Sequence, residues 1–143
     1  MPPTMQTGSD TQAESMLIRV MESSLSLEPG MEATHEFEVN GRLLTDVGGT
    51  LTASVLSTPA MIGMMERTAS MLVYPKLADG QATVGFEVCV KHVAAAPQGT
   101  RCTVRARLEE IVDSRKLRFA VEVVSDDGRT IGVGTHERRV ISV

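Results

Sequence analysis

Three side chains in the middle of the sequence have the chemistry of catalytic groups. Thr58 and Glu66 are eight residues apart in a segment with the apolar spacing of a helix, and His92 ends a run with the alternation of a strand. A carboxylate can act as a general base or a nucleophile, and an imidazole can transfer protons. A fixed hydroxyl can bind a carbonyl oxygen. Whether the three act together depends on the elements that carry them.

Each of these residues also has an ordinary structural explanation. Thr58 precedes Pro59 and could simply cap a helix. Glu66 lies at the border of the apolar arc on a helical projection, where a carboxylate can serve as a base but can equally reach water. His92 continues an apolar face, and a lone histidine there is more often a hydrogen-bonded core residue than a catalyst. The residue types alone leave both interpretations open.

The helix that carries Thr58 and Glu66 is predicted to begin with Thr58 as N-cap and Pro59 in its first turn. It should end near Tyr74–Pro75, because the residue before a proline is disfavoured in the α region. Its apolar arc contains several methionines, which we interpret as core packing. The arc consists of Met61, Ile62, Met64, Met65, Thr68, Ala69, Leu72 and Val73.

The remaining pattern is that of strands. A first strand precedes the turn pair Asn40-Gly41, and residues 42–57 have the Gly, Thr and Ser content of a loop or lid. Four β-rich runs follow the helix, and we expect them to form a meander with one face covered by the helix. These runs cover residues 82–95, 100–112, 116–124 and 130–140. The expected fold class is α+β.

Alternation along the strands predicts which side chains face the helix. Val84, Phe86 and His92 share one face of their run, so all three should point to the covered side. Gly85 within this strand marks a bulge or a close approach of the backbone to a ligand, where its N–H could stabilise an oxyanion. In the last strand the side chains of His136 and Arg138 should point outward, unless a glycine there introduces a bulge.

The composition is that of a single domain. The chain has 143 residues, and its 14 Lys and Arg against 18 Asp and Glu give a net charge of −4 with no basic cluster. Nucleic acid is therefore not expected as a partner. The two cysteines lack the spacing of metal ligands, which indicates reduced, buried thiols. No apolar run is long enough to span a bilayer, so we expect a cytoplasmic protein without a membrane partner.

Residues 1–26 are expected to be mobile, whereas residues 27–143 are expected to be folded. The first 15 residues are polar, rich in Pro, Thr and Ser, and nearly free of large apolar side chains. Such a segment cannot compensate for its ordering entropy by burial. We predict a mobile N-terminal arm and short lead-in over residues 1–26, followed by one domain over residues 27–143.

Three motifs resemble the fluoroacetyl-CoA thioesterase-like branch of the hot-dog thioesterases. They are TPAMIGMME at residues 58–66, VGFEVCVKHVAAAPQG at 84–99 and IGVGTHER at 131–138. The resemblance implies an antiparallel sheet wrapped around one central helix. It also implies a homodimer, or a tetramer made of such dimers, because hot-dog domains join their sheets and build their sites across that junction.

The same resemblance implies an activity and roles for residues. The expected reaction is hydrolysis of a short or modified acyl-CoA thioester, with Thr58, Glu66 and His92 as the catalytic group, the Gly85 amide as an oxyanion donor and Arg138 near the substrate. Coenzyme A would be part of the substrate, with no bound cofactor and no metal. The alternatives are a hot-dog enoyl-thioester hydratase or dehydratase, and a non-catalytic acyl-CoA binding module. The loop before Thr58 departs from the family because it has no aromatic lid residue.

Overall fold

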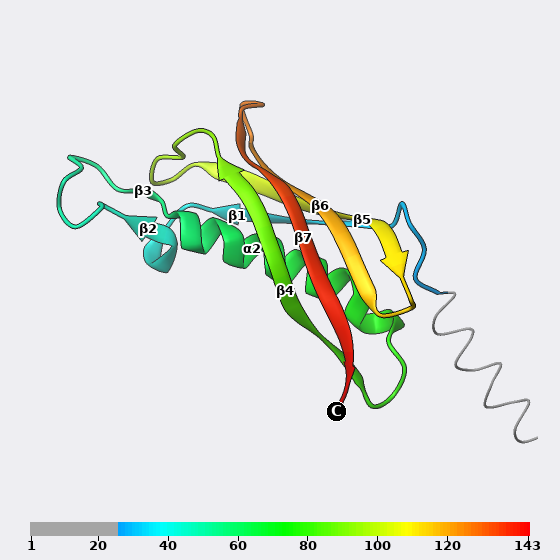
Figure 1. Ribbon diagram of the computed structural model, residues 1–143. Coiled ribbons are helices and arrows are strands. Elements are labelled where there is room, and N and C mark those ends of the chain that lie inside the picture. Colours follow the sequence, from blue (N-terminus) through cyan, green and yellow to red (C-terminus); the bar gives the residue numbers. More distant parts are fainter. Residues whose placement is uncertain (1–25) are drawn as a thin grey trace, which may run out of the picture.

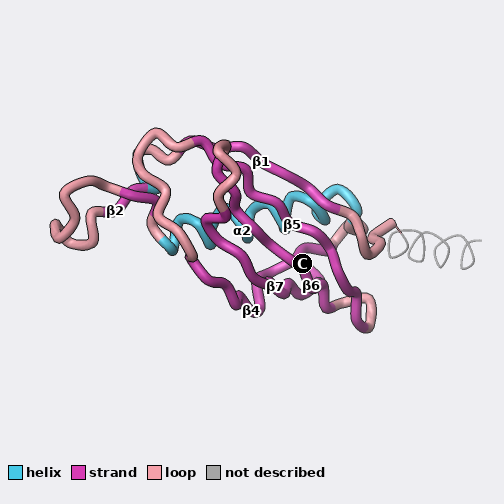
Figure 2. The backbone as a smooth tube through the Cα atoms, turned by 90° about the horizontal axis from the view of Figure 1, so that it is seen from above, coloured by secondary structure: helices cyan, strands magenta, loops and turns pink. Residues whose placement is uncertain are grey.

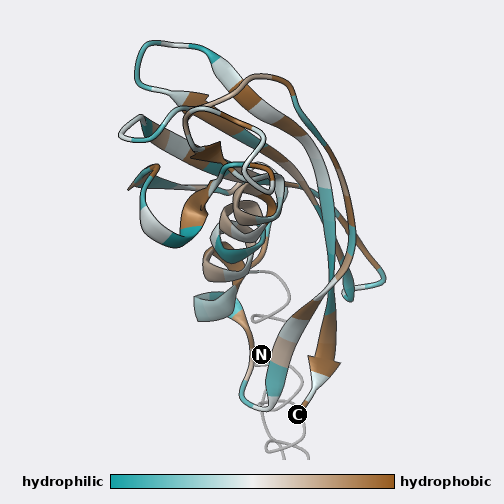
Figure 3. Ribbon diagram, turned by 90° about the vertical axis from the view of Figure 1, so that its left-hand side faces the viewer, coloured by the Kyte–Doolittle hydropathy of each residue, from teal (hydrophilic) through white to brown (hydrophobic). Residues whose placement is uncertain are grey.

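The computed structural model describes residues 26–143, in which one long helix lies against an antiparallel sheet (Figure 1). The sheet curves around the helix, as the view along the helix shows (Figure 3). The expected α+β class is confirmed. The arm predicted over residues 1–26 lies outside the described residues, apart from Ser26. No helix within the described part of the chain is long and apolar enough to cross a membrane.

Five strands form the main sheet, in the order β1-β5-β6-β7-β4 with every neighbouring pair antiparallel. Their bounds are Glu32–Glu38 for β1, Gln81–His92 for β4, Arg101–Val112 for β5, Lys116–Ser125 for β6 and Thr130–Ser142 for β7. The predicted strand runs are therefore confirmed. The predicted four-strand meander is wrong, because β4 lies beside β7 and forms one edge of the sheet (Figure 2).

Turn lengths explain this order of strands. The β5–β6 hairpin closes tightly through Asp113 and Ser114, whose φ angles of 55° and 53° suit the turns that match the twist of a hairpin. A longer loop, residues 93–100, connects β4 to β5 and contains Pro97. A loop of this length can carry the chain from one edge of the sheet to a strand that is not its neighbour. Only β5, β6 and β7 therefore form a meander.

The central helix α2 covers Thr58–Val73, with its start and end close to those predicted. The N-cap is Ser57, whose side chain accepts a hydrogen bond from the Ala60 N–H at 3.1 Å. The prediction that Thr58 caps the helix is therefore wrong by one residue. Because Ser57 satisfies the first turn, the Thr58 hydroxyl is free to bond elsewhere.

The buried face of α2 packs on the concave side of the sheet. A Cβ on Gly132 would lie 2.3 Å from the Met61 sulfur, so only glycine allows the helix to approach β7 this closely. Met71, on the same helix, is exposed and takes no part in the core. The buried helix residues are Met61, Met64, Met65, Thr68, Ala69 and Val73.

A bulge in β4 changes the predicted orientation of side chains. The pairing with β7 shifts between Gly85 and Glu87, so that Gly85 faces the helix while Val84 and Phe86 do not. Their exposed fractions are 44% and 58%. The extra residue reverses the alternation, and the prediction that these two side chains face the helix is wrong. His92, beyond the bulge, does contact the helix as predicted.

A second bulge decides the orientation of the last strand. Val123 pairs with Gly132, but Val124 pairs with Thr130, which leaves Ile131 as the extra residue. The alternation after this point is reversed. His136 and Arg138 are consequently buried on the side of the helix, and their expected outward orientation holds only for a regular strand.

Shorter elements close the two ends of the helix. A two-stranded hairpin of β2 (Leu44–Thr45) and β3 (Val55–Leu56) follows the 3₁₀ turn η1 (Gly41–Leu43), and a second turn, η2 (Tyr74–Lys76), follows α2. The loop of residues 46–54 extends beyond the helix start (Figure 1).

The two cysteines differ in their surroundings. Both are free, but Cys102 is buried whereas Cys89, on β4, is exposed. Burial of Cys89 was predicted wrongly, because it lies on the face of β4 that points away from the helix.

Candidate functional site

The first candidate cluster joins the helix start to the end of β4. The Thr58 Oγ1 lies 2.8 Å from the His92 Nδ1, and the two residues are 34 positions apart in sequence. The other ring nitrogen, His92 Nε2, is buried and has no hydrogen-bond partner among the described residues. A buried nitrogen without a hydrogen-bond partner lowers the stability of a folded protein. Such an atom is therefore a marker of functional sites.

A cavity of about 350 Å³ opens beside this pair. Its walls come from the β2–β3 hairpin, the start of α2 and the segment after β4, and they are mostly small or aliphatic. The lining residues are Thr45, Val47, Val55, Leu56, Ser57, Thr58, His92, Val93, Ala94 and Ala95. No Phe, Tyr or Trp is among the described residues that line the cavity, which agrees with the lack of these residues in the loop before Thr58.

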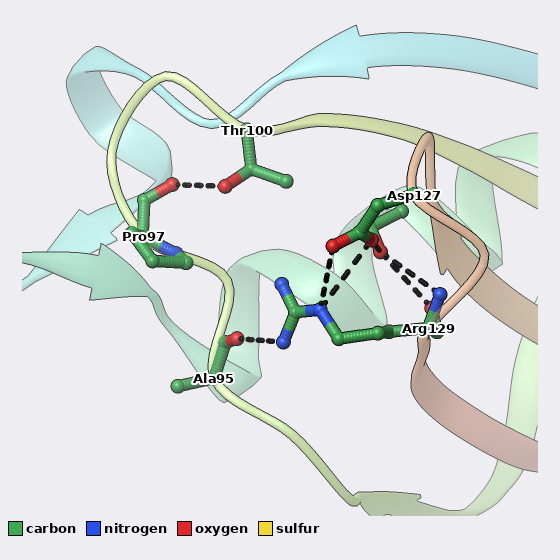
Figure 4. A network of polar contacts seen from close by, with 6 residues as sticks. Ala95, Pro97, Thr100, Asp127 and Arg129 are labelled. Carbon is green, nitrogen blue, oxygen red and sulfur yellow. Dashed lines mark hydrogen bonds and ion pairs between the residues drawn. The ribbon is translucent and has the colours of Figure 1, made fainter.

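Backbone and side-chain contacts fix the wall that follows β4 (Figure 4). Arg129 donates from its Nη1 to the Ala95 carbonyl at 3.3 Å, while its Nε is 3.1 Å from the Asp127 carboxylate. Hydrogen bonds from Ser125 and Arg129 lower the pKa of Asp127. The Thr100 hydroxyl donates to the Pro97 carbonyl at 2.7 Å. The β6–β7 turn thereby holds the cavity wall in place.

The second cluster lies at Glu66, in the middle of the helix. A Cβ on Gly85 would lie 2.8 Å from the Glu66 Oε2, 3.6 Å from His136 and 3.7 Å from the Arg138 Nη1. A carboxylate, an imidazole and a guanidinium thus meet at one point of the β4 backbone. Glycine is the residue that leaves room there. The bulge predicted at Gly85 is confirmed by the shift in strand pairing, whereas the close approach to a ligand stays a prediction.

Arg138 is held rigidly in this cluster. Its Nε donates to the Thr83 hydroxyl at 2.9 Å, its Nη2 to the Thr83 carbonyl at 3.1 Å, and its Nη1 lies 3.3 Å from the His136 Nε2. Burial lowers the pKa of Arg138, and the nearby Glu66 carboxylate acts in the opposite direction. The guanidinium therefore places a fixed positive charge close to Glu66.

Thr58 and His92 come together in one chain, whereas Glu66 belongs to the other cluster. The eight residues from Thr58 to Glu66 correspond to a rise of about 12 Å along the helix. Within one chain, Glu66 therefore does not meet Thr58 and His92, and the grouping of all three as one catalytic site stays a prediction. His136 belongs to the second cluster, but it was not predicted as a site residue, because regular alternation placed its side chain on the face away from the helix. The glycines near the bulge in β7 were the one sign in the sequence that the alternation could be reversed.

Either cluster alone is chemically incomplete. One has a proton-transfer pair and an apolar cavity, and the other has a carboxylate, a backbone amide and a cation. Together they would provide a base or nucleophile, a proton carrier and groups that stabilise a developing oxyanion. No group of three metal-binding side chains occurs among residues 26–143.

The contact between Thr58 and His92 predicts a difference between two variants of Thr58. Thr58→Ser keeps the hydroxyl and should retain most activity, whereas Thr58→Ala should reduce kcat by about tenfold, the equivalent of one hydrogen bond. Neither change removes the helix cap, so melting temperatures should stay close to the wild-type value.

Ser57→Ala provides the matched control for stability, because it does remove the cap and should cost about 1 kcal/mol. If Thr58→Ala melts as early as Ser57→Ala and keeps its activity, Thr58 has only a structural role.

Comparison with known protein families gives a match over most of the chain. The family described as fluoroacetyl-CoA-specific thioesterase matches residues 39–143. The fluoroacetyl-CoA thioesterase of Streptantibioticus cattleyicolor is 40% identical over 87 residues, which are 61% of this chain and 61% of that protein. The alignment thus spans less than two thirds of that relative's length.

Solved structures agree with this match. The fluoroacetyl-CoA thioesterase FlK has a TM-score of 0.73 at 32% identity, covering 81% of this chain and 89% of that chain. A thioesterase superfamily member from Thermus thermophilus has a TM-score of 0.73 at 28% identity, over 80% and 84% of the two chains. A hot-dog-like protein from Thermanaerovibrio acidaminovorans, 22% identical, has a TM-score of 0.77 over 86% and 90% and shows the fold.

Proposed function

The chain belongs to the fluoroacetyl-CoA-specific thioesterase family, and from this premise we propose that it hydrolyses a short or modified acyl-CoA thioester to the free acid and CoA. The observation that carries the proposal is the Glu66 carboxylate set against the backbone of Gly85 with Arg138 beside it. One solved variant of FlK, 32% identical, is in complex with fluoroacetate and CoA. Coenzyme A is then part of the substrate.

The proposed chemistry assigns a role to each group. Glu66 activates water or attacks the thioester carbonyl itself, and His92 transfers protons while Thr58 holds its ring. The Gly85 amide and the Arg138 cation stabilise the negative charge that develops on the carbonyl oxygen.

We propose further that the complete site forms between two copies of the chain. β4 is an edge strand of 12 residues without proline, and an uncovered edge of this length is suited to pairing with a second strand. Antiparallel pairing of β4 with the same strand of a second copy would give a twofold homodimer. Two such dimers could associate further into a tetramer.

Charge and orientation favour one register for this pairing. Directly opposed residues in antiparallel strands point to the same face. With Cys89 on the twofold axis, Glu87 lies opposite the partner's Lys91, and both side chains are on the face away from the helix. The bulge at Gly85 then lies next to the partner's His92. This register brings Glu66 of one copy to the Thr58–His92 pair of the other.

The state of the two cysteines bears on the compartment in which the protein acts. Neither Cys89 nor Cys102 forms a disulfide, and unpaired thiols are typical of reducing compartments. We therefore propose that the protein acts in the cytoplasm.

A panel of thioesters tests the activity and its alternatives. We expect release of CoA from saturated short-chain acyl-CoA substrates. Fluoroacetyl-CoA should be no better a substrate than acetyl-CoA, because the described residues that line the cavity include no Phe, Tyr or Trp. Enoyl-CoA should gain no water across its double bond. Hydration of enoyl-CoA would instead favour a hydratase, and tight binding without turnover would favour a binding module. The measurement compares the rate at which the free CoA thiol is released with the rate at which each acyl-CoA substrate is consumed.

A further inference from the structure

We propose that His136 is a positioning residue, which fixes the guanidinium of Arg138 beside Glu66 and Gly85 by accepting a hydrogen bond from it. This inference rests on the proposed function, because the cluster it organises is the one assigned to thioester cleavage. Its physical basis is the arrangement of donors and acceptors around one buried imidazole ring.

The two neighbours of His136 determine which ring nitrogen carries the proton. Nδ1 lies 2.8 Å from the Glu87 carbonyl oxygen, which can only accept, so Nδ1 must be the donor. Nε2 lies 3.3 Å from the Arg138 Nη1, which can only donate, so Nε2 must be the acceptor. The ring is therefore neutral, and both of its nitrogens have a partner.

The surroundings of His136 favour this neutral form. The residue is 2% exposed and its ring stacks on Phe119 at a centroid distance of 6.1 Å. Burial is the main reason that the pKa of His136 lies below its ordinary value; the Arg138 charge lowers it as well, whereas the Glu87 hydrogen bond and Glu66 act in the opposite direction.

The charged groups around the ring come from several elements. On the helix side it faces Glu66 and Arg138. His136 also lines a cavity of about 280 Å³, together with further charged residues. These are Glu87 of β4, Glu109 and Glu110 of β5, Arg118 of β6 and Glu137 of β7.

Arg138 needs this contact because an oppositely charged group is close by. Three of its five N–H donors are used by Thr83 and His136, while its Nη1 faces the point where a Cβ would stand on Gly85. No ion pair within 4.0 Å joins Arg138 to Glu66 in the described part of the chain. Without the acceptor on His136, the guanidinium could turn to pair directly with Glu66 and neutralise the catalytic carboxylate.

Two substitutions separate the two hydrogen bonds of the ring. His136→Gln places an amide oxygen where Nε2 was, so it keeps the acceptor for Arg138. His136→Asn places an amide nitrogen where Nδ1 was, so it keeps only the donor to Glu87. We expect His136→Asn to lower kcat by about tenfold to a hundredfold, with a smaller change in KM, as for a displaced catalytic group. His136→Gln should recover at least about tenfold of that loss.

Two further readouts distinguish positioning from general stability. In an Arg138→Gln background, His136→Asn should have little additional effect on kcat, because the group that it positions is gone. The wild-type rate should also fall as the pH drops below the ordinary histidine value of 6.5, since protonation removes the Nε2 acceptor. His136→Gln should lose that part of the pH dependence.

The outcomes separate this inference from the proposed function. If the wild type releases no CoA from any thioester, the proposed function fails. If the wild type is active and His136→Asn equals it in kcat, or if the two losses simply add in the double variant, the positioning role is wrong. Melting curves show whether each variant compared is folded. If His136→Asn does not fold, the pH profiles of the wild type and His136→Gln test the role; if His136→Gln does not fold, the effect of His136→Asn with and without Arg138→Gln tests it.

Discussion

Glu66→Gln is expected to lower kcat for acyl-CoA hydrolysis by at least about a hundredfold, the lower end for losing a general base or nucleophile. Glutamine keeps the shape of the side chain and removes only its charge. The change leaves the packing against Gly85 in place and abolishes the ability to accept a proton or attack a carbonyl carbon. The measurement is the rate of CoA release at saturating substrate.

His92→Ala tests the other cluster in the same assay and should show a loss of similar size. The control for both variants is thermal melting, because about 1 kcal/mol changes the melting temperature by about 5 °C in a domain of this length. If both variants are folded and turn over acyl-CoA at near wild-type rates, Glu66 and His92 are only structural residues.

Mixing these two inactive variants should restore about a quarter of the wild-type activity, if the site is shared across a twofold dimer. Random pairing makes about half of the dimers mixed. In a mixed dimer one site receives both substitutions, and the other combines the intact Glu66 of one copy with the intact His92 of the other. A site contained within one chain would gain nothing from mixing.

Two controls accompany the mixing experiment. Light scattering of the wild type should give about twice the chain mass of 15.4 kDa. Oxidation with copper phenanthroline should join Cys89 to the partner's Cys89 as a disulfide, and Cys89→Ser should abolish the cross-link. An active monomer, or a mixture that remains inactive although the subunits exchange, would contradict the shared site.

The elements were predictable from the sequence because their signals are local. Apolar spacing and Pro59 located α2, and the Asn40-Gly41 pair located the end of the first strand. Each of these depends on the φ and ψ preferences of a few neighbouring residues. The strand order was not predictable in this way, because pairing β4 with β7 depends on contacts between distant segments.

The candidate residues themselves were determined by the sequence, but their grouping was decided by the tertiary structure. Thr58 and His92 were singled out from motifs, and the structure joins them because Ser57 takes over the helix cap. The orientation of His136 and Arg138 depends on one extra residue in β7, which reverses every side chain after it. Periodicity cannot locate such a residue, because the energy that fixes it comes from packing against α2 and β6.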